Sequence, residues 1–306
     1  MPTSEYLHMR GFNYQPSYSS CLQYTWTHFD AAAWEREAPW AARFGSNMLR
    51  LWLDWSAYLA LGDALADRID AALGILDRNG LRAMLVLFNR WVDPVYPAGG
   101  VSDNDLRTSG WGFEKFDAYV DLLAARFGSD PRVGLWDVCN EPLSPGWNAQ
   151  DILFRELAWL SHVADRIRRR SRIPLTVGAM TYDFVLQTAS LCDVISFHPY
   201  PHRIGEMEQL CRDHLDLAAR FGKPLICTET CCGSLDDAER GALARDNIET
   251  LERHGIGWLA WHLCESRFVT GSRSRTDSNA VRPGEGYMPF VLADGRTRPS
   301  HEWLEK

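Results

Sequence analysis

The 306-residue chain lacks the features of a membrane protein and of a disulfide-stapled protein. All of its apolar runs fall short of the roughly 18 residues that a membrane-spanning helix needs. Its first residues contain neither the basic segment nor the apolar segment of a secretion signal. The spacing of the eight cysteines does not match a disulfide framework. Several of them lie in apolar runs, where cysteine behaves as a small hydrophobic residue. These absences predict a reduced, cytoplasmic protein without a membrane partner.

Positive charge is also in deficit, with a formal net charge of −8. This balance argues against nucleic acid or an anionic membrane as the main partner. The vicinal pair Cys231-Cys232 is a hint of metal or redox chemistry, but no Cys-x-x-Cys or paired-histidine motif supports it. We therefore predict no metal site and no cofactor, and nothing in the sequence indicates the oligomeric state. The 13 tryptophans are many; flat aromatic faces suit sugar rings, although core packing is the ordinary use.

The chain does contain a repeated alternation of helix-like stretches and short apolar runs. Helix-like stretches end on glycine at Gly45, Gly80, Gly128, Gly222 and Gly255, and an apolar run follows each within a few residues. Three further apolar runs complete the set. The predicted strands are Met9–Asn13, Asn47–Leu53, Arg82–Phe88, Val133–Val138, Leu175–Ala179, Val194–Phe197, Pro224–Thr228 and Ile256–Trp261.

Eight alternating β/α units predict an α/β protein with a closed (β/α)8 TIM barrel, as a single domain over residues 1–306. An open, doubly wound sheet is the alternative. Such a sheet typically has a glycine-rich, phosphate-binding loop after its first strand, and the segment Gly11–Tyr14 does not match that loop. The least regular segment, 266–286, would follow the eighth strand as a solvated loop or as an active-site lid.

The segment Val133–Pro142 ends a continuous apolar run on Asn140-Glu141-Pro142. Proline cannot extend a central strand, so Glu141 stands at the carboxyl end of its strand, where α/β folds place their chemistry. A carboxylic acid held there suits proton transfer to a polar substrate. Taken alone, the residue fits equally well as a helix cap or as the partner of an arginine.

The other predicted strand ends carry an unusual set of polar and aromatic residues. In a barrel these ends meet at one mouth, which makes a shared site the better interpretation. Paired carboxylates serve glycoside hydrolysis, in which one protonates the leaving oxygen and the other, ionised, attacks or stabilises the anomeric carbon. We expect Arg50 to hold Glu229 charged, an apolar setting to raise the pKa of Glu141, and Trp261 to stack on a sugar ring. The candidate residues are Glu141 and Glu229 as the catalytic pair, with Arg50, Asn89, Asn140, His198, Tyr200 and Trp261 as substrate-binding residues.

With these residues the chain resembles the clan A glycoside hydrolases, closest to the family 5 group of cellulases and mannanases. The tail Asp294-Gly295-Arg296-Thr297-Arg298-Pro299 is similar to that group's turn into its last helix. The resemblance implies that Glu141 is the acid/base, Glu229 the nucleophile, Asn140 the partner of the sugar 2-hydroxyl, and that Tyr200 hydrogen-bonds the nucleophile. Many members have a histidine near the end of strand three, where this chain has Asn89-Arg90, so the substrate is not fixed by the resemblance.

The sequence thus predicts a retaining β-glycoside hydrolase whose partner is a soluble β-linked oligosaccharide or glycoside. Two alternatives stay open. One is a carbohydrate-binding barrel without catalysis, and the other is a transglycosylase that uses the same residues. The sequence separates neither endo from exo action nor one sugar from another.

Overall fold

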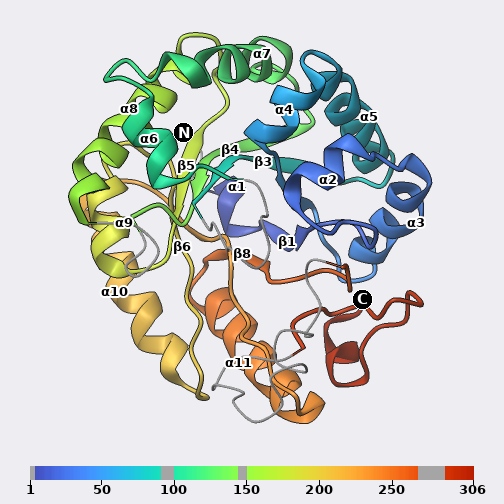
Figure 1. Ribbon diagram of the computed structural model, residues 1–306. Coiled ribbons are helices and arrows are strands. Elements are labelled where there is room, and N and C mark those ends of the chain that lie inside the picture. The colour runs from blue at the N-terminus through green and yellow to red at the C-terminus, as the bar shows by residue number, and fades with distance from the viewer. Residues whose placement is uncertain (1–3, 91–99, 144–149, 268–286) are drawn as a thin grey trace.

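The computed structural model describes residues 4–90, 100–143, 150–267 and 287–306. Eight parallel strands pair in chain order and close into a barrel, β1-β2-β3-β4-β5-β6-β7-β8, with helices around it (Figure 1). The predicted (β/α)8 fold is confirmed. Apart from its first two positions, the predicted loop 266–286 lies outside the described residues.

Each predicted strand is present, with its ends shifted by no more than two residues. The largest difference is at the fourth strand, which continues to Asn140 and so delivers Glu141 directly from a buried strand. The strands are β1 Arg10–Tyr14, β2 Met48–Trp52, β3 Arg82–Asn89, β4 Val133–Asn140, β5 Leu175–Ala179, β6 Ile195–Phe197, β7 Leu225–Cys227 and β8 Gly257–Ala260.

Most helices lie in the connections between strands, and several connections hold more than one. The α-helices are α1 Ser4–Leu7, α2 Leu22–Thr27, α3 Ala31–Ala42, α4 Trp55–Leu61, α5 Ala64–Arg78, α6 Asp103–Thr108, α7 Asp117–Phe127, α8 Leu153–Arg168, α9 Tyr182–Thr188, α10 Glu206–Phe221 and α11 Asp237–Arg253. Short 3-10 helices are η1 Glu114–Phe116, η2 Gln150–Ile152 and η3 Pro299–Leu304. Among the described residues, no helix is both long and apolar enough to cross a membrane.

Local signals set several helix ends. Asp30 caps α3, because its carboxylate accepts from the backbone N–H groups of Ala32 and Ala33. Gly222 ends α10 in the left-handed conformation, at φ +61°. The spacing of Ser234 and Asp237 predicts a capping box for α11, and this prediction is wrong. Asp236 is the N-cap instead.

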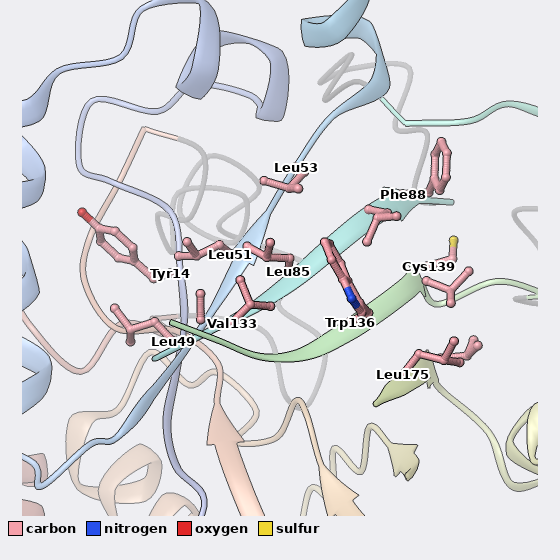
Figure 2. Close-up of a cluster of buried hydrophobic side chains, with 14 of the residues drawn as sticks. Tyr14, Leu49, Leu51, Leu53, Leu85, Phe88, Val133, Trp136, Cys139 and Leu175 are labelled. Carbon is pink, nitrogen blue, oxygen red and sulfur yellow. The ribbon is translucent and has the colours of Figure 1, made fainter. Parts of the chain in front are cut away.

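The hydrophobic core lies between the sheet and the surrounding helices. Outward-facing residues of neighbouring strands pack side by side there, which removes their apolar surface from water and stabilises the barrel wall. Figure 2 shows part of this layer, with Tyr14, Leu49, Leu51, Leu53, Leu85, Phe88, Val133, Trp136, Cys139 and Leu175 labelled.

The inside of the barrel is layered, because inward and outward side chains alternate along each strand. At the amino-terminal end the inward residues are apolar. Two positions beyond Met48, Leu135 and Ile226 stand Arg50, Asp137 and Thr228, all buried and polar. The apolar layer therefore forms the floor beneath a polar layer. The apolar layer consists of Tyr6, Met9, Met48, Met84, Leu135, Val194, Ile226 and Leu259.

The C-terminal tail closes the wall beside α3. Gly295 takes φ +83° in the predicted turn, and the backbone N–H of Lys306 donates to the carbonyl of Arg43 at 2.9 Å. The last helix, which follows this turn, is the 3-10 helix η3.

Candidate active site

Glu141 and Glu229 meet at the mouth of the barrel. Glu141 directly follows β4, and Glu229 is the second residue after β7. The two residues are only 3% and 4% exposed. A carboxylate oxygen of one lies within 4.8 Å of a carboxylate oxygen of the other. The backbone of Glu141 is left-handed, at φ +44°, and its N–H donates to the carbonyl of Gly178 at 2.6 Å. Because such a conformation is strained for a residue other than glycine, the surrounding contacts must hold it in place.

Arg50 links the polar layer to Glu229. Its Nε and Nη2 donate to Oδ2 of Asp137 at 3.0 and 2.7 Å, and Nη2 also donates to Oδ1 of Asn140 at 2.8 Å. Its Nη1 donates to Oδ1 of Asn13 at 2.8 Å and to Oε1 of Glu229. These contacts engage all five N–H groups of the guanidinium. The side chain is fully buried, so Arg50 positions the site from below.

Glu229 accepts a second hydrogen bond, from the hydroxyl of Tyr200 at 2.8 Å. Burial raises the pKa of Glu229, while His198, Arg50 and the Tyr200 bond act in the opposite direction. The predicted contact between Arg50 and Glu229 is present, and Arg50 lowers the pKa of Glu229 against the larger effect of desolvation. Burial beside two carboxylates also raises the pKa of Tyr200 well above its usual value, so its hydroxyl stays a donor.

His198 lies between the two glutamates, just beyond β6. Its Nδ1 is 2.8 Å from Oε1 of Glu141 and 3.7 Å from Oε2 of Glu229, and its Nε2 is 2.8 Å from Oγ1 of Thr228. Burial lowers the pKa of His198 to about 4, so the ring is neutral near pH 7.

Asn140 and Asn89 complete the polar layer at the ends of β4 and β3. The Nδ2 group of Asn140 donates to Oδ1 of Asn89 at 3.2 Å. The next residue, Arg90, contacts Glu156 of α8 at 2.6 Å and Asp103 of α6, so it braces the helices outside the strands. Of the pair Asn89-Arg90, it is therefore the side chain of Asn89 that contacts the polar layer.

Gly178 of β5 makes room for this group. A Cβ atom there would lie 2.8 Å from Nε2 of His198, 2.9 Å from Nη2 of Arg50 and 3.0 Å from Oδ2 of Asp137. Real Cβ atoms essentially never approach other heavy atoms to less than 3.0 Å. Even alanine would therefore displace the groups that hold both glutamates.

Trp261 follows β8 at the same mouth and is partly buried. Its ring meets that of Trp52 edge to face, with centroids 5.5 Å apart, and Trp52 in turn stacks on the Arg50 guanidinium at 4.8 Å. The peptide bond between Trp261 and His262 is cis. The aromatic pair thus adjoins the polar layer and leaves part of Trp261 accessible.

The polar layer depends on further residues that are not among the candidates predicted from the sequence. Asn13 accepts from Arg50, and its Nδ2 donates to the carbonyl of Thr228 at 2.8 Å. Asp137 accepts from both Arg50 and the backbone N–H of Gly178, at 3.0 Å for the latter. A signal for Asp137 did exist, because it is the one acid within the apolar run of β4. Thr228, which contacts Nε2 of His198, and Ser196, which accepts from Thr228 at 3.2 Å, carried no comparable signal.

One group among the described residues could hold a metal ion, namely Glu141, His198 and Glu229. Arg50 and Tyr200 already donate to Glu229, and the positive charge of Arg50 opposes a second cation, so we interpret the group as one for proton transfer. Cys231 and Cys232 lie outside it. Both are buried, and the Sγ of Cys232 donates to the carbonyl of Pro201 at 2.8 Å.

Comparisons with known proteins agree with this geometry. A family model described as cellulase (glycosyl hydrolase family 5) matches residues 17–267. Mannan endo-1,4-beta-mannosidase A of Podospora anserina is 25% identical over 190 residues, which cover 53% of this chain and 50% of that protein. The match therefore spans about half the length of this curated relative.

Two solved structures share the fold over 97% of this chain. An exo-beta-1,4-mannosidase from Opitutaceae bacterium strain TAV5 gives a TM-score of 0.75 at 17% identity, over 58% of its own length. An endo-1,4-beta-D-mannanase from Thermotoga petrophila RKU-1 gives 0.66 at 16% identity, over 98% of its length. At such identities the likeness supports the fold alone. Because the family model covers well over half of the sequence, the chain belongs to glycosyl hydrolase family 5.

Proposed function

We propose that this protein is a retaining β-glycoside hydrolase that cleaves soluble β-linked oligosaccharides or glycosides by double displacement. The observation that carries the proposal is the approach of the Glu141 and Glu229 carboxylate oxygens to within 4.8 Å. Retaining enzymes hold their two carboxyl groups about 5–5.5 Å apart, whereas inverting enzymes separate them by about 6.5–9.5 Å to admit a water. The observed spacing favours direct attack by a carboxylate.

In the first step we assign Glu229 as the nucleophile and Glu141 as the acid. An ionised oxygen of Glu229 forms a bond to the anomeric carbon while the bond from that carbon to the leaving oxygen breaks. Glu141 transfers its proton to the leaving oxygen. Tyr200 and Arg50, which donate to Glu229, hold the attacking carboxylate in place.

In the second step Glu141 acts as a base. It takes a proton from water, the resulting hydroxide oxygen bonds to the anomeric carbon, and the bond to Glu229 breaks. Asn140 donates one N–H to Asn89, and we assign its second N–H to the sugar 2-hydroxyl. A hydrogen bond there strengthens in the transition state. Trp261, partly open at the mouth, is the surface on which we place the sugar ring.

The names of the relatives suggest an order in which to test substrates. Two of those described above are mannosidases and one is a mannanase, so β-mannosides come first. A GH5_18 protein of Streptomyces cattleya, solved with Manβ1-4GlcNAc, has the same fold with a TM-score of 0.68 at 14% identity. We therefore include a Manβ1-4GlcNAc disaccharide. Cytoplasmic localisation stays a prediction.

The test uses aryl β-mannoside, β-glucoside, β-galactoside and β-xyloside substrates, and NMR follows the anomer of the best substrate's first product. We expect turnover of at least one substrate and a first-formed β-anomer. A first-formed α-anomer would exclude the retaining mechanism. Binding of a sugar without turnover of any glycoside would instead support a carbohydrate-binding barrel.

A further inference from the structure

A chain of hydrogen bonds runs from Glu141 into the barrel wall. Oε1 of Glu141 lies 2.8 Å from Nδ1 of His198, and Nε2 of His198 lies 2.8 Å from Oγ1 of Thr228. Oγ1 of Thr228 lies 3.2 Å from Oγ of Ser196, which lies 3.0 Å from the carbonyl oxygen of Val177. Apart from the two ends, every link is a group that can both donate and accept.

The carbonyl at the far end sets the direction of the chain. A carbonyl oxygen only accepts, so the hydroxyl proton of Ser196 points to Val177. Ser196 then accepts from Thr228, which uses the single proton of the Thr228 hydroxyl. Thr228 is left as the acceptor for Nε2–H of His198. Because both hydroxyls are buried, water does not offer them other partners.

A neutral His198 with its proton on Nε2 presents a lone pair on Nδ1 to Glu141. That lone pair is satisfied only when Glu141 is protonated and donates to it. The low pKa of His198 agrees with a neutral ring, and its cause is burial.

The charged groups around His198 favour the same arrangement. Arg50 acts on the ring from β2, Asp137 from β4, Glu141 from the position directly after β4, and Glu229 from the segment after β7. The single positive charge of Arg50 already faces Asp137 and Glu229. Ionising Glu141 would add a third negative charge to this buried group.

We propose that Thr228 and Ser196 are positioning residues, which fix the Nε2–H tautomer of His198 and thereby keep Glu141 protonated in the resting enzyme. The proposal rests on the proposed function, because it explains how Glu141 is ready to act as the acid. The same Nδ1 lone pair makes the ionised Glu141 a stronger base. It thus also favours the return of a proton from water in the second step.

The tautomer is measured directly by NMR on protein labelled with 15N-histidine. The protein has nine histidines, and the signals that disappear in His198→Gln are those of His198. In the wild type we expect a protonated Nε2 and an unprotonated Nδ1 at neutral pH. Thr228→Val removes the acceptor of Nε2–H, so the proton should move to Nδ1 and donate to Glu141. A wild-type ring protonated on Nδ1 would overturn the proposal.

The second readout is the pH dependence of kcat/KM on a β-glycoside with a poor leaving group. In Thr228→Val the ionised form of Glu141 gains a donor, so the basic limb should move to lower pH by about one unit or more. Ser196→Ala frees the Thr228 proton for Nε2 and should shift the limb in the same direction. Thr228→Ser keeps the hydroxyl and should restore the wild-type profile.

The matched control is Thr176→Val, which removes a buried hydroxyl of β5 outside this chain of bonds. It should leave the basic limb in place. An unchanged limb in both Thr228→Val and Ser196→Ala, with melting temperatures near that of the wild type, would refute the positioning role. If the wild type hydrolyses no β-glycoside, the proposed function fails, while the NMR experiment still decides on the tautomer.

Discussion

The Arg50 guanidinium donates to Glu229 and, at 2.7 Å, to Asp137, and no part of its side chain reaches solvent. One buried positive charge thus serves two buried carboxylates. Its stabilisation of the Glu229 carboxylate is incomplete, and burial still raises the pKa of Glu229. An arginine in this position therefore limits how far that pKa can rise.

Arg50→Met should raise the pKa of Glu229 further. Only the ionised carboxylate attacks, so the acidic limb of kcat/KM should move to higher pH. The free energy of unfolding should fall by about 3–5 kcal/mol, because two buried carboxylates lose their partner. Urea unfolding and a pH–rate profile measure both effects. Arg126→Met, which removes a half-exposed partner of Asp70, should cost no more than about 1 kcal/mol. An acidic limb that stays in place would contradict this role of Arg50.

Trp261→Ala should weaken substrate binding and turnover while the fold survives, because the partly open ring contacts sugar in our proposal and does no bond chemistry. Trp136→Ala provides the contrast. This fully buried ring also donates to Oγ of Ser171, and its loss should cost about 3–5 kcal/mol of stability. Melting temperatures and kinetics of the two variants decide the matter. A Trp261 variant as unstable as the Trp136 variant would make Trp261 a core residue.

The fold and the candidate residues at the mouth were predictable from the sequence for a common reason. Apolar strands and glycine-ended helices are local signals, and a barrel brings the carboxyl ends of all strands together. Glu141 and Glu229 could thus be paired from the sequence alone, although the positions of their carboxylate oxygens could not be predicted.

The layer beneath them was less predictable, because its contacts depend on strand register and on room inside the barrel. Asp137 can pair with Arg50 because Gly178, on the strand between β4 and β6, has no Cβ atom that would occupy the space of their side chains. The pKa of Glu229 likewise depends on two opposing effects, because burial raises it and Arg50 lowers it. Residue types alone do not show which effect is larger.

The eight cysteines should all be reduced thiols, as none forms a disulfide in the structure. A thiol reagent should modify all eight in the unfolded, unreduced protein. In the native protein Cys21 should react first, because it is partly exposed and the other seven are buried. Mass spectrometry of the alkylated protein counts the modified sites. Recovery of only some thiols after unfolding, with mass losses for missing hydrogens, would overturn the predicted reducing compartment.

Glu229→Ala should abolish hydrolysis while substrate binding remains, because it removes the nucleophile and leaves the acid. Added azide can enter the vacated space and attack an activated β-glycoside directly. The product should then be a glycosyl azide of inverted configuration, which NMR identifies. Unimpaired hydrolysis by this variant would assign the nucleophile to another residue.

Glu141→Ala should behave differently, although its carboxylate lies within 4.8 Å of Glu229. A good leaving group needs little protonation, so dinitrophenyl glycosides should still react in the first step, whereas alkyl glycosides should lose activity by about 100-fold or more. The second step lacks its base, so the glycosyl-enzyme should accumulate, as a burst and an intact-mass measurement would detect. Azide should release it with retained configuration, opposite to the Glu229→Ala product. Equal losses on good and poor leaving groups would show that Glu141 is not the acid.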